Sequence, residues 1–313
     1  MIALAFAAAV VLTAAPPTAR RVAITFDDLP TVSVAGDGLA ADVALTEKLL
    51  AAIRQSGAPA IGFVNEGKLA PAGGPPEGAR VALLEKWLEA GLDLGNHTYS
   101  HPDLHRIPRE DYEKEVARGD EITRRLLAAR GKRPRYFRHP FLHTGRDLAT
   151  KTGLEEFLAA RGYAVAPVTH DNSEWIFARA YAGAARRGDR ARADRIAAAY
   201  VPYMNAKFDY FESQSRKLFA REIPQVLLLH ANALNADTFG ALAAMMRRRG
   251  YAFVPLDEAL TDEAYRSADT YTGPAGITWL HRWALSRGGK DLVLPNEPRS
   301  PDFVLKEAGI DAE

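Results

Sequence analysis

The sequence of 313 residues contains no cysteine. This absence excludes disulfide bonds, thiolate nucleophiles and cysteine-ligated zinc, so any metal ion must be held by histidine and carboxylate side chains. The chain also lacks a net charge of either sign, because 40 Lys and Arg residues against 39 Asp and Glu residues leave only +1. No overall field would steer the protein toward nucleic acid or an anionic membrane, and we expect neither as a partner.

The long apolar run at the N-terminus is too short to cross a bilayer comfortably. It reads MIALAFAAAVVLTAA and gives way to PPTARR. A membrane span needs about 20 apolar residues, whereas this run has the length of the apolar region of a signal peptide. We therefore expect residues 1–19 to be a signal peptide, and the protein to be periplasmic or secreted without stable membrane insertion. No Lys or Arg precedes the run, and the alternative is a buried N-terminal segment.

Short apolar runs alternate with segments of helical spacing. Seven runs predict strands: RVAITF, PAIGFVN, LDLGN, PRYFR, YAVAPV, QVLLLH and YAFVPL. Helical spacing occurs over residues 39–56, 79–90, 109–130, 152–161 and 236–249, each followed by a Gly placed like a helix C-cap. Alternating elements with strands apolar on both faces predict a parallel sheet covered by helices. A closed barrel fits this number of units better than an open doubly wound sheet, which is the alternative.

Two regions break the alternation. Residues 176–222 form a long helical stretch with an aromatic patch, which is typical either of an enlarged loop lining a binding face or of a helical pair on the barrel exterior. Residues 263–313 are expected to be an irregular tail, rich in Pro and Gly, that packs on the barrel. In this tail we expect Trp279 and Trp283 to be buried, because a helical aromatic pair usually packs inward.

Titratable side chains follow most of the predicted strands. Asp27 and Asp28 follow the first strand, His97 and His101 the third, Arg138 the fourth, His170, Asp171 and Glu174 the fifth, and His230 the sixth. In parallel β/α architectures the loops after the strands open on one face. We therefore expect these side chains to share one rim.

The spacing of His97 and His101 allows both imidazoles to converge on one ion. Alone, this HxxxH pattern is weak and is more typical of two surface histidines than of a metal site. Together with a carboxylate from the first strand it supplies two nitrogens and one oxygen, as in catalytic zinc sites with an open position. One aspartate of the Asp27–Asp28 pair can then bind the cation, while the other takes a proton from a metal-bound water.

The strings TFDD, HTYSH, RHPF, DNSEW and LLLH, in this order, resemble the motifs of the polysaccharide deacetylases of carbohydrate esterase family 4, the NodB-homology domain. The resemblance implies a distorted (β/α)7 barrel of the TIM-barrel type. It implies a catalytic domain over residues 20–262 with a helical insertion at about 176–222, followed by the tail.

The resemblance also implies roles for the first three motifs. Asp27 would be the catalytic base, and Arg138 would pair with it. Asp28, His97 and His101 would hold a divalent metal ion, most often Zn²⁺, with Co²⁺, Ni²⁺ or Mn²⁺ as alternatives.

The remaining roles concern the oxyanion and the leaving group. The backbone N–H of Phe141 would help to stabilise the oxyanion, and His230 would be the general acid. Either Asp171 or Glu174 would orient His230, because this chain has Glu-Trp where the family usually has Asp-Trp. Trp175 would line the sugar site, although a buried aromatic beside a strand is equally typical.

The implied reaction is hydrolytic removal of N-acetyl groups from a chitin-like or peptidoglycan-like glycan, which would be the substrate partner. O-deacetylation of a xylan-like polysaccharide and a non-catalytic glycan-binding barrel are the alternatives. Leu29 stands where the family usually has Gly, so we expect the loop beside Asp27 to have a different shape. Four histidines near the motifs are expected to be surface or supporting groups: His105, His139, His143 and His170.

Overall fold

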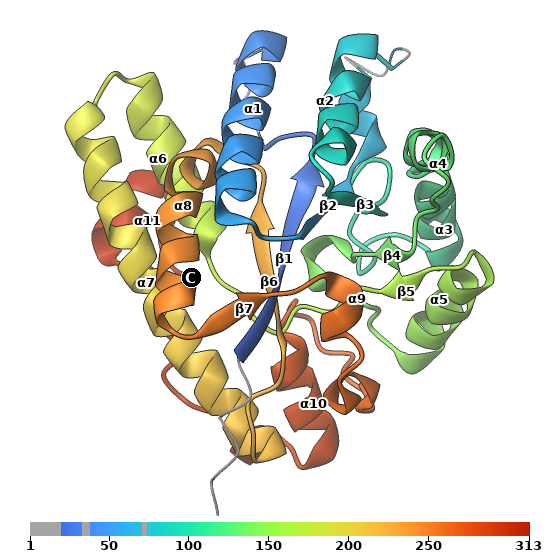
Figure 1. The fold of residues 1–313 in the computed structure, drawn as a ribbon. Helices are drawn as coiled ribbons and strands as arrows, with labels where there is room; N and C mark the ends of the chain where they lie inside the picture. The colour runs from blue at the N-terminus through green and yellow to red at the C-terminus, as the bar shows by residue number, and fades with distance from the viewer. Residues whose placement is uncertain (1–19, 33–37, 71–73, 75) are drawn as a thin grey trace, which may run out of the picture.

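The computed structural model describes residues 20–32, 38–70, 74 and 76–313; the expected signal peptide lies outside them. Seven parallel strands form one sheet in the order β5-β4-β3-β2-β1-β6, with β7 paired to the start of β1 (Figure 1). The strands are β1 (Arg20–Leu29), β2 (Ala60–Val64), β3 (Asp93–Asn96), β4 (Tyr136–Phe137), β5 (Ala164–Val165), β6 (Gln225–His230) and β7 (Tyr251–Phe253). Each apolar run identified in the sequence overlaps one of them, and β1 extends beyond its run at both ends.

The sheet closes into a barrel because the segment after β5 pairs with β6. His170 forms an isolated parallel bridge with Leu227, and its N–H donates to the carbonyl of Val226 at 3.0 Å. The two ends of the strand order therefore meet, and the predicted distorted (β/α)7 barrel is confirmed. The distortion lies at β4 and β5, which are only two residues long each.

Helices surround the sheet on its outer face (Figure 1). They are α1 (Gly38–Ser56), α2 (Gly78–Glu89), α3 (Arg109–Arg118), α4 (Glu121–Ala128), α5 (Leu148–Ala160) and α8 (Ala233–Arg248). The glycines predicted to end helices have φ values from 63° to 82°, in the left-handed region that suits this position: Gly57, Gly91, Gly131, Gly162 and Gly250. No helix in the described ranges combines the length and apolar character needed to cross a membrane.

The segment 109–130, expected to be one helical stretch, is two helices. Gly119 separates α3 from α4, and a Cβ at this position would lie 2.4 Å from the carbonyl carbon of Thr98. The chain therefore passes another loop too closely for a side chain. The first backbone N–H groups of α4 have no partner within the helix, and Glu66 supplies one: its carboxylate accepts the N–H of Ile122 at 2.9 Å.

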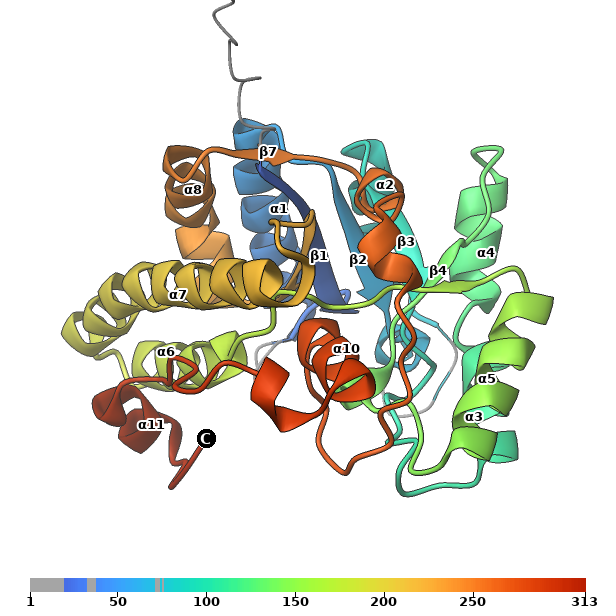
Figure 2. The same cartoon turned by 90° about the horizontal axis from the view of Figure 1, so that it is seen from below.

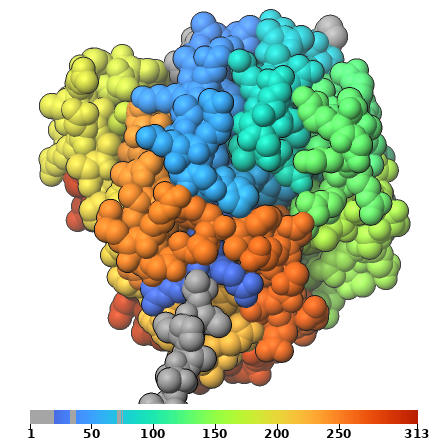
Figure 3. Space-filling view, in the orientation of Figure 1, coloured from blue at the N-terminus to red at the C-terminus, as the bar shows by residue number. Residues whose placement is uncertain are grey.

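The insertion is a helical pair, α6 (Glu174–Arg186) and α7 (Arg190–Phe219), whose turn projects at the upper left of Figure 3. Beyond β7, α9 (Leu256–Ala259), α10 (Trp279–Arg287) and α11 (Asp302–Ala308) follow, and Figure 2 shows the chain running from α10 past α6 to α11. The expectation of an irregular tail is therefore wrong in part, because two helices form within it. Trp279 and Trp283 are buried as predicted.

Alternation along β1 separates two parts of the core. Val22, Ile24 and Phe26 belong to the largest hydrophobic cluster, which includes side chains of the surrounding helices. Ala23 belongs to another cluster, formed largely by residues of the other strands. Side chains at odd positions of β1 therefore point inward, and Asp27 continues this inward series at the end of the strand.

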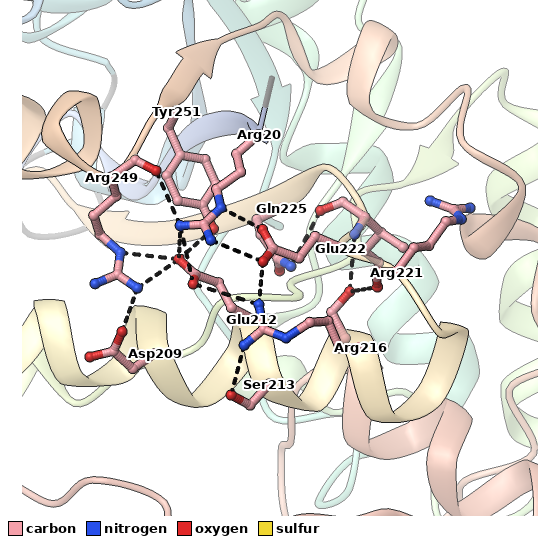
Figure 4. A network of polar contacts seen from close by, with 12 residues as sticks. Arg20, Asp209, Glu212, Ser213, Arg216, Arg221, Glu222, Gln225, Arg249 and Tyr251 are labelled. Atoms are coloured by element: carbon pink, nitrogen blue, oxygen red, sulfur yellow. Dashed lines mark hydrogen bonds and ion pairs between the residues drawn. The ribbon is translucent and has the colours of Figure 1, made fainter. Parts of the chain in front are cut away.

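A buried carboxylate ties the insertion to the opposite end of the barrel. Glu212 of α7 accepts hydrogen bonds from Arg20 at the start of β1 (3.3 Å), from Arg249 (2.8 Å) and from the hydroxyl of Tyr251 in β7 (3.2 Å) (Figure 4). Asp209, one turn earlier on α7, also pairs with Arg249, at 2.5 Å. The long helix is thus fixed to the starts of β1 and β7.

Candidate active site

A bulge in β1 places two neighbouring acids at the same rim. Between Phe26 and Leu29, β1 advances by three residues while β2 advances by two, and Asp28 has a φ of 69°. In a regular strand, neighbouring side chains would point to opposite faces. Here Asp27 Oδ2 and Asp28 Oδ1 both lie near His97 Nε2, at 3.8 and 3.7 Å.

Leu29 explains how the loop differs from the family pattern. Its side chain is fully buried, and a Cβ at Gly62 of β2 would lie 2.3 Å from it. Leu29 thus packs into the core against Gly62, and this apolar contact holds the bulge in place.

Asp28, His97 and His101 form a group that could hold a metal ion. Asp28 Oδ1 lies 3.7 Å from His97 Nε2 and 3.5 Å from His101 Nε2. This oxygen is buried and has no hydrogen-bond partner among the described residues. His97 Nδ1 lies 2.8 Å from the carbonyl of Arg138, so Nδ1 carries the proton and the lone pair of Nε2 is free. The donor set suits a divalent first-row ion.

The loop that carries the two histidines is held under strain. Thr98 and His101 have φ values of 67° and 59°, a conformation that costs about 1–3 kcal/mol for a residue other than Gly. Glu115 compensates by accepting the N–H of Ser100 at 2.7 Å, and Asn65 donates to the carbonyl of His97 at 2.5 Å. Neighbouring elements therefore determine where both imidazoles point.

Asp27 is fixed by a fully buried arginine. Arg138 Nη1 lies 3.1 Å from both carboxylate oxygens of Asp27, while its Nη2 donates to Thr25 Oγ1 at 3.1 Å and its Nε to the carbonyl of Ala166 at 2.9 Å. Burial raises the pKa of Asp27 to about 6, although the charge of Arg138 opposes this. Such a pKa suits a group that exchanges a proton near neutral pH.

Of the two acids that the sequence left open, Glu174 is the one bonded to His230. Its Oε2 lies 2.8 Å from His230 Nδ1, and its Oε1 accepts from Asn235 Nδ2 at 2.9 Å. Asp171 accepts the N–H of Asn172 at 2.8 Å and has no hydrogen bond to His230 within the described part of the chain. Burial lowers the pKa of His230, but the bond and charge of Glu174 outweigh burial and raise it to about 9.

Phe141 lies at the rim of the same site. Phe141 and Leu142 have φ values of 57° and 54°, two successive non-glycine residues in the left-handed region. The Phe141 ring is 53% exposed and meets the His101 ring at a centroid distance of 4.5 Å. The loop after β4 thus places the Phe141 ring beside the metal group.

A second group of potential ligands lies next to this loop: Asp103, His105 and His143. The two imidazole rings are stacked, 3.8 Å apart with an interplanar angle of 8°. An imidazole binds a metal in its ring plane, so two parallel stacked rings cannot both direct a lone pair at one ion. His143 Nδ1 already bonds Asp103 Oδ1 at 2.7 Å. We read this group as a support for the loop, as expected for His105 and His143.

The candidate metal ligands and the acid–base groups line a cleft of about 770 Å³. Its lining residues include Asp27, Asp28, His97, His101, Phe141 and His230. Further lining residues come from the insertion and the tail, and include Trp175, which is 49% exposed, with Lys207, Glu297 and Arg299. His139 also lines the cleft, and burial, followed by the charge of Arg282, lowers its pKa to about 3. His170 is buried against the ring of Phe208.

Lys68 is a site residue that sequence reasoning missed. Its Nζ donates to the carbonyl of Asp28 at 2.9 Å and lies 3.7 Å from Oδ1 of the same residue. Burial works to raise the pKa of Asp28, but Lys68 and the two nearby histidines outweigh burial and lower it, so the carboxylate stays ionised. Lys68 follows the second strand closely, and extending the survey of strand ends to that strand would have found it.

The barrel and the titratable groups at its strand ends define a β/α-barrel with a candidate metal-binding group in a cleft. Residues 14–157 match the family model described as polysaccharide deacetylase. The peptidoglycan-N-acetylglucosamine deacetylase of Bacillus cereus is 28% identical over 126 residues, 40% of this chain and 38% of that protein. The chitin deacetylase of Colletotrichum lindemuthianum is 28% identical over 156 residues, 49% of this chain and 52% of that protein. The matches thus span about half or less of these curated relatives.

A solved structure supports the fold. The structure of the chitin deacetylase from Colletotrichum lindemuthianum aligns with a TM-score of 0.52 at 22% identity, covering 78% of this chain and 88% of that one. Together the matches confirm the resemblance seen in the motifs, because residues 14–157 match the polysaccharide deacetylase family model.

Proposed function

We propose that this protein is an exported, metal-dependent deacetylase that hydrolyses the N-acetyl groups of an amino-sugar glycan, either chitin-like or peptidoglycan-like. The observation that carries the proposal is the convergence of Asp28 Oδ1 with His97 Nε2 (3.7 Å) and His101 Nε2 (3.5 Å) in one cleft. The names of the two curated relatives support the acetylated glycan as substrate class.

Asp27 is the group placed to accept a proton from the attacking water. A divalent ion held by Asp28, His97 and His101, with Zn²⁺ the first candidate, would polarise the acetamide carbonyl and lower the pKa of water there. Arg138 keeps both oxygens of Asp27 at 3.1 Å and so fixes the direction from which the proton is taken.

His230 is the group placed to protonate the leaving amine. Its Nδ1 is engaged by Glu174, so Nε2 is the atom that can donate a proton to the substrate. With its pKa raised to about 9, the ring holds that proton at neutral pH. The backbone N–H of Phe141 would stabilise the negative charge that develops on the carbonyl oxygen.

The test is acetate release from chitin oligosaccharides, peptidoglycan and acetylated xylan, each with and without a chelator. We expect release from one of the N-acetylated substrates, its loss with the chelator, and its recovery when Zn²⁺ is restored. Acetate release only from acetylated xylan would show that the substrate is an ester and not an amide. Glycan binding without acetate from any substrate would mark a non-catalytic barrel.

The variant Asp27→Asn separates the base from the metal group. It should retain the metal and lose turnover, because the carboxylate that accepts the proton is removed while the three ligand side chains stay. Near-normal turnover in this variant would refute the assignment of Asp27 as the base.

A further inference from the structure

The geometry points to a role for the tail that the motifs do not carry: we propose that Arg282 of α10 is a positioning residue for the Phe141 loop. By holding that loop in its strained conformation, Arg282 fixes the backbone that would face the oxyanion. The kinetic part of this inference rests on the proposed deacetylase function, whereas its structural part does not.

Arg282 joins the loop after β4 to the tail. Its Nη1 donates to Thr144 Oγ1 at 2.7 Å, its Nη2 donates to the carbonyl of Leu142, and its Nε donates to the carbonyl of Ile277 at 3.0 Å. Two of these acceptors belong to the loop and one to the tail. The guanidinium is therefore a cross-link between two segments that lie more than 130 residues apart.

The environment of Arg282 suits a fixed rather than a mobile side chain. It is only 1% exposed, and its guanidinium lies over the Trp279 ring at 4.4 Å. Asp269, which pairs with Lys151 at 2.6 Å, also lies 3.6 Å from Arg282 Nη1. A buried charge with three directed hydrogen bonds is costly to displace. A lysine could not reproduce this geometry, because its ammonium lacks the planar fork that reaches two acceptors at once.

The loop needs such support because its conformation is unfavourable. Phe141 and Leu142 both have positive φ, and conformations of this kind persist only where the surroundings over-determine them. Arg282 bonds the carbonyl of Leu142, which is one of the two strained residues. The tail also passes very close to the Phe141 loop, since a Cβ at Gly276 would lie 1.8 Å from the carbonyl oxygen of Phe141.

The loop is clamped from its other side by the segment that follows the metal-binding histidines. His143 Nδ1 bonds Asp103 Oδ1 at 2.7 Å, and the N–H of Gly145 donates to His105 Nε2 at 3.3 Å. The loop thus lies between the metal group and α10. Because the polysaccharide deacetylase match ends at residue 157, the clamp on the α10 side comes from a part of the chain outside it.

The experiment compares Arg282→Met and Arg282→Lys with the wild-type protein by amide hydrogen exchange and by steady-state kinetics. In Arg282→Met we expect exchange over residues 141–145 to quicken by about tenfold to a hundredfold, which is the range expected for losing a charged hydrogen bond. We expect kcat to fall by about the same factor while KM changes little, because the loop would act on the transition state. Arg282→Lys should lie between the two.

Arg287→Met is the matched control. Arg287 also lies on α10 and also anchors the tail, with its Nη2 donating to Ser267 Oγ at 2.7 Å, but it has no contact with the Phe141 loop among the described residues. It should leave exchange over 141–145 and kcat unchanged. If it reproduces the Arg282→Met effect, general loosening of the tail is the cause and the inference is wrong.

Thr144→Val covers the case in which Arg282→Met does not fold. It removes the Oγ1 acceptor from the loop side and leaves α10 intact, so exchange over 141–145 should quicken by a smaller factor. Unchanged exchange there in folded Arg282→Met, or in Thr144→Val if only that variant folds, would overturn the inference. Since exchange needs no substrate, this result is separate from a failure of the proposed deacetylase activity.

Discussion

Glu174 Oε2 and His230 Nδ1 lie 2.8 Å apart; against the lowering effect of burial, this contact, together with the charges of Asp28 and Asp27, raises the pKa of the imidazole to about 9. Replacing Glu174 by Gln removes the negative charge that stabilises the imidazolium. We expect the pKa of His230 to fall toward its ordinary value and kcat at neutral pH to fall by about tenfold to a hundredfold. The pH profile of kcat and NMR titration of the imidazole measure the two effects.

Asp171→Asn is the control for this contact. Asp171 lines the same cleft and is half-buried, but it has no hydrogen bond to His230 in the described ranges. Its replacement should shift the pKa of His230 much less than Glu174→Gln does. An equal shift in both variants would mean that the total negative charge of the cleft, rather than the Glu174 contact, sets the pKa.

The activity should follow a bell-shaped pH profile. Asp27, with its pKa raised to about 6, must lose a proton to act as a base, so activity rises as the pH increases through that value. His230 must keep its proton, so activity falls as the pH increases through about 9. A bound cation favours the carboxylate and disfavours the imidazolium, so both limbs of the loaded enzyme should lie at lower pH. A profile without an acid limb would contradict the role of Asp27.

Metal binding should stabilise the fold measurably. A ligand present at 100 times its dissociation constant adds about 2.7 kcal/mol to the free energy of unfolding. Chelated protein should therefore melt at a higher temperature when Zn²⁺ is added, and elemental analysis should find one ion per chain. His101→Ala should abolish both effects.

His143→Ala tests the interpretation of the second histidine group. Because its ring is stacked on His105 and its Nδ1 is bonded to Asp103, its loss should leave the metal content and the Zn²⁺-induced melting shift unchanged. A loss of one bound ion in this variant would show that the stacked histidines are ligands after all.

Glu212 should be important for stability and not for catalysis. Its buried carboxylate accepts from Arg20, Arg249 and Tyr251 at the end of the barrel away from the cleft. Glu212→Gln leaves these donors with a neutral partner, and we expect a loss of about 2–3 kcal/mol in the free energy of unfolding. Chemical denaturation measures this loss, and kcat should be unaffected.

Asp209→Asn is the surface counterpart of that change. The Asp209 side chain is 64% exposed and pairs with the same Arg249. An exposed ion pair contributes about 0–1 kcal/mol, so the variant should unfold almost like the wild type. If it lost as much stability as Glu212→Gln, the burial of Glu212 would not be the cause of its importance.

The strands and helix ends could be predicted because their causes are local. A run such as QVLLLH is apolar whatever surrounds it, and Gly250 ends a helix through its own backbone freedom. The break at Gly119 could not be predicted, because it results from contact with Thr98, which is distant in sequence. The same holds for Arg282, whose partners in the loop are visible only in three dimensions.

Within the site, the motifs gave the residues but not every contact. They identified His230 and two candidate acids, and geometry selected Glu174 as the bonded one. Spacing alone could not do this, because both acids precede the same helix or begin it. Lys68 was overlooked for a different reason, since a lysine after a strand is usually a solvated side chain.

The extra residue in β1 limits how this site can change. The main chain, and not the choice of side chain, sets the separation between Asp27 and Asp28. Deleting either of the two residues between Phe26 and Leu29 would restore plain alternation and remove one of the two acids, so the bulge and the acid pair would be lost together. The site therefore depends on the number of residues in β1, and a substitution at another position could not compensate for the loss of one.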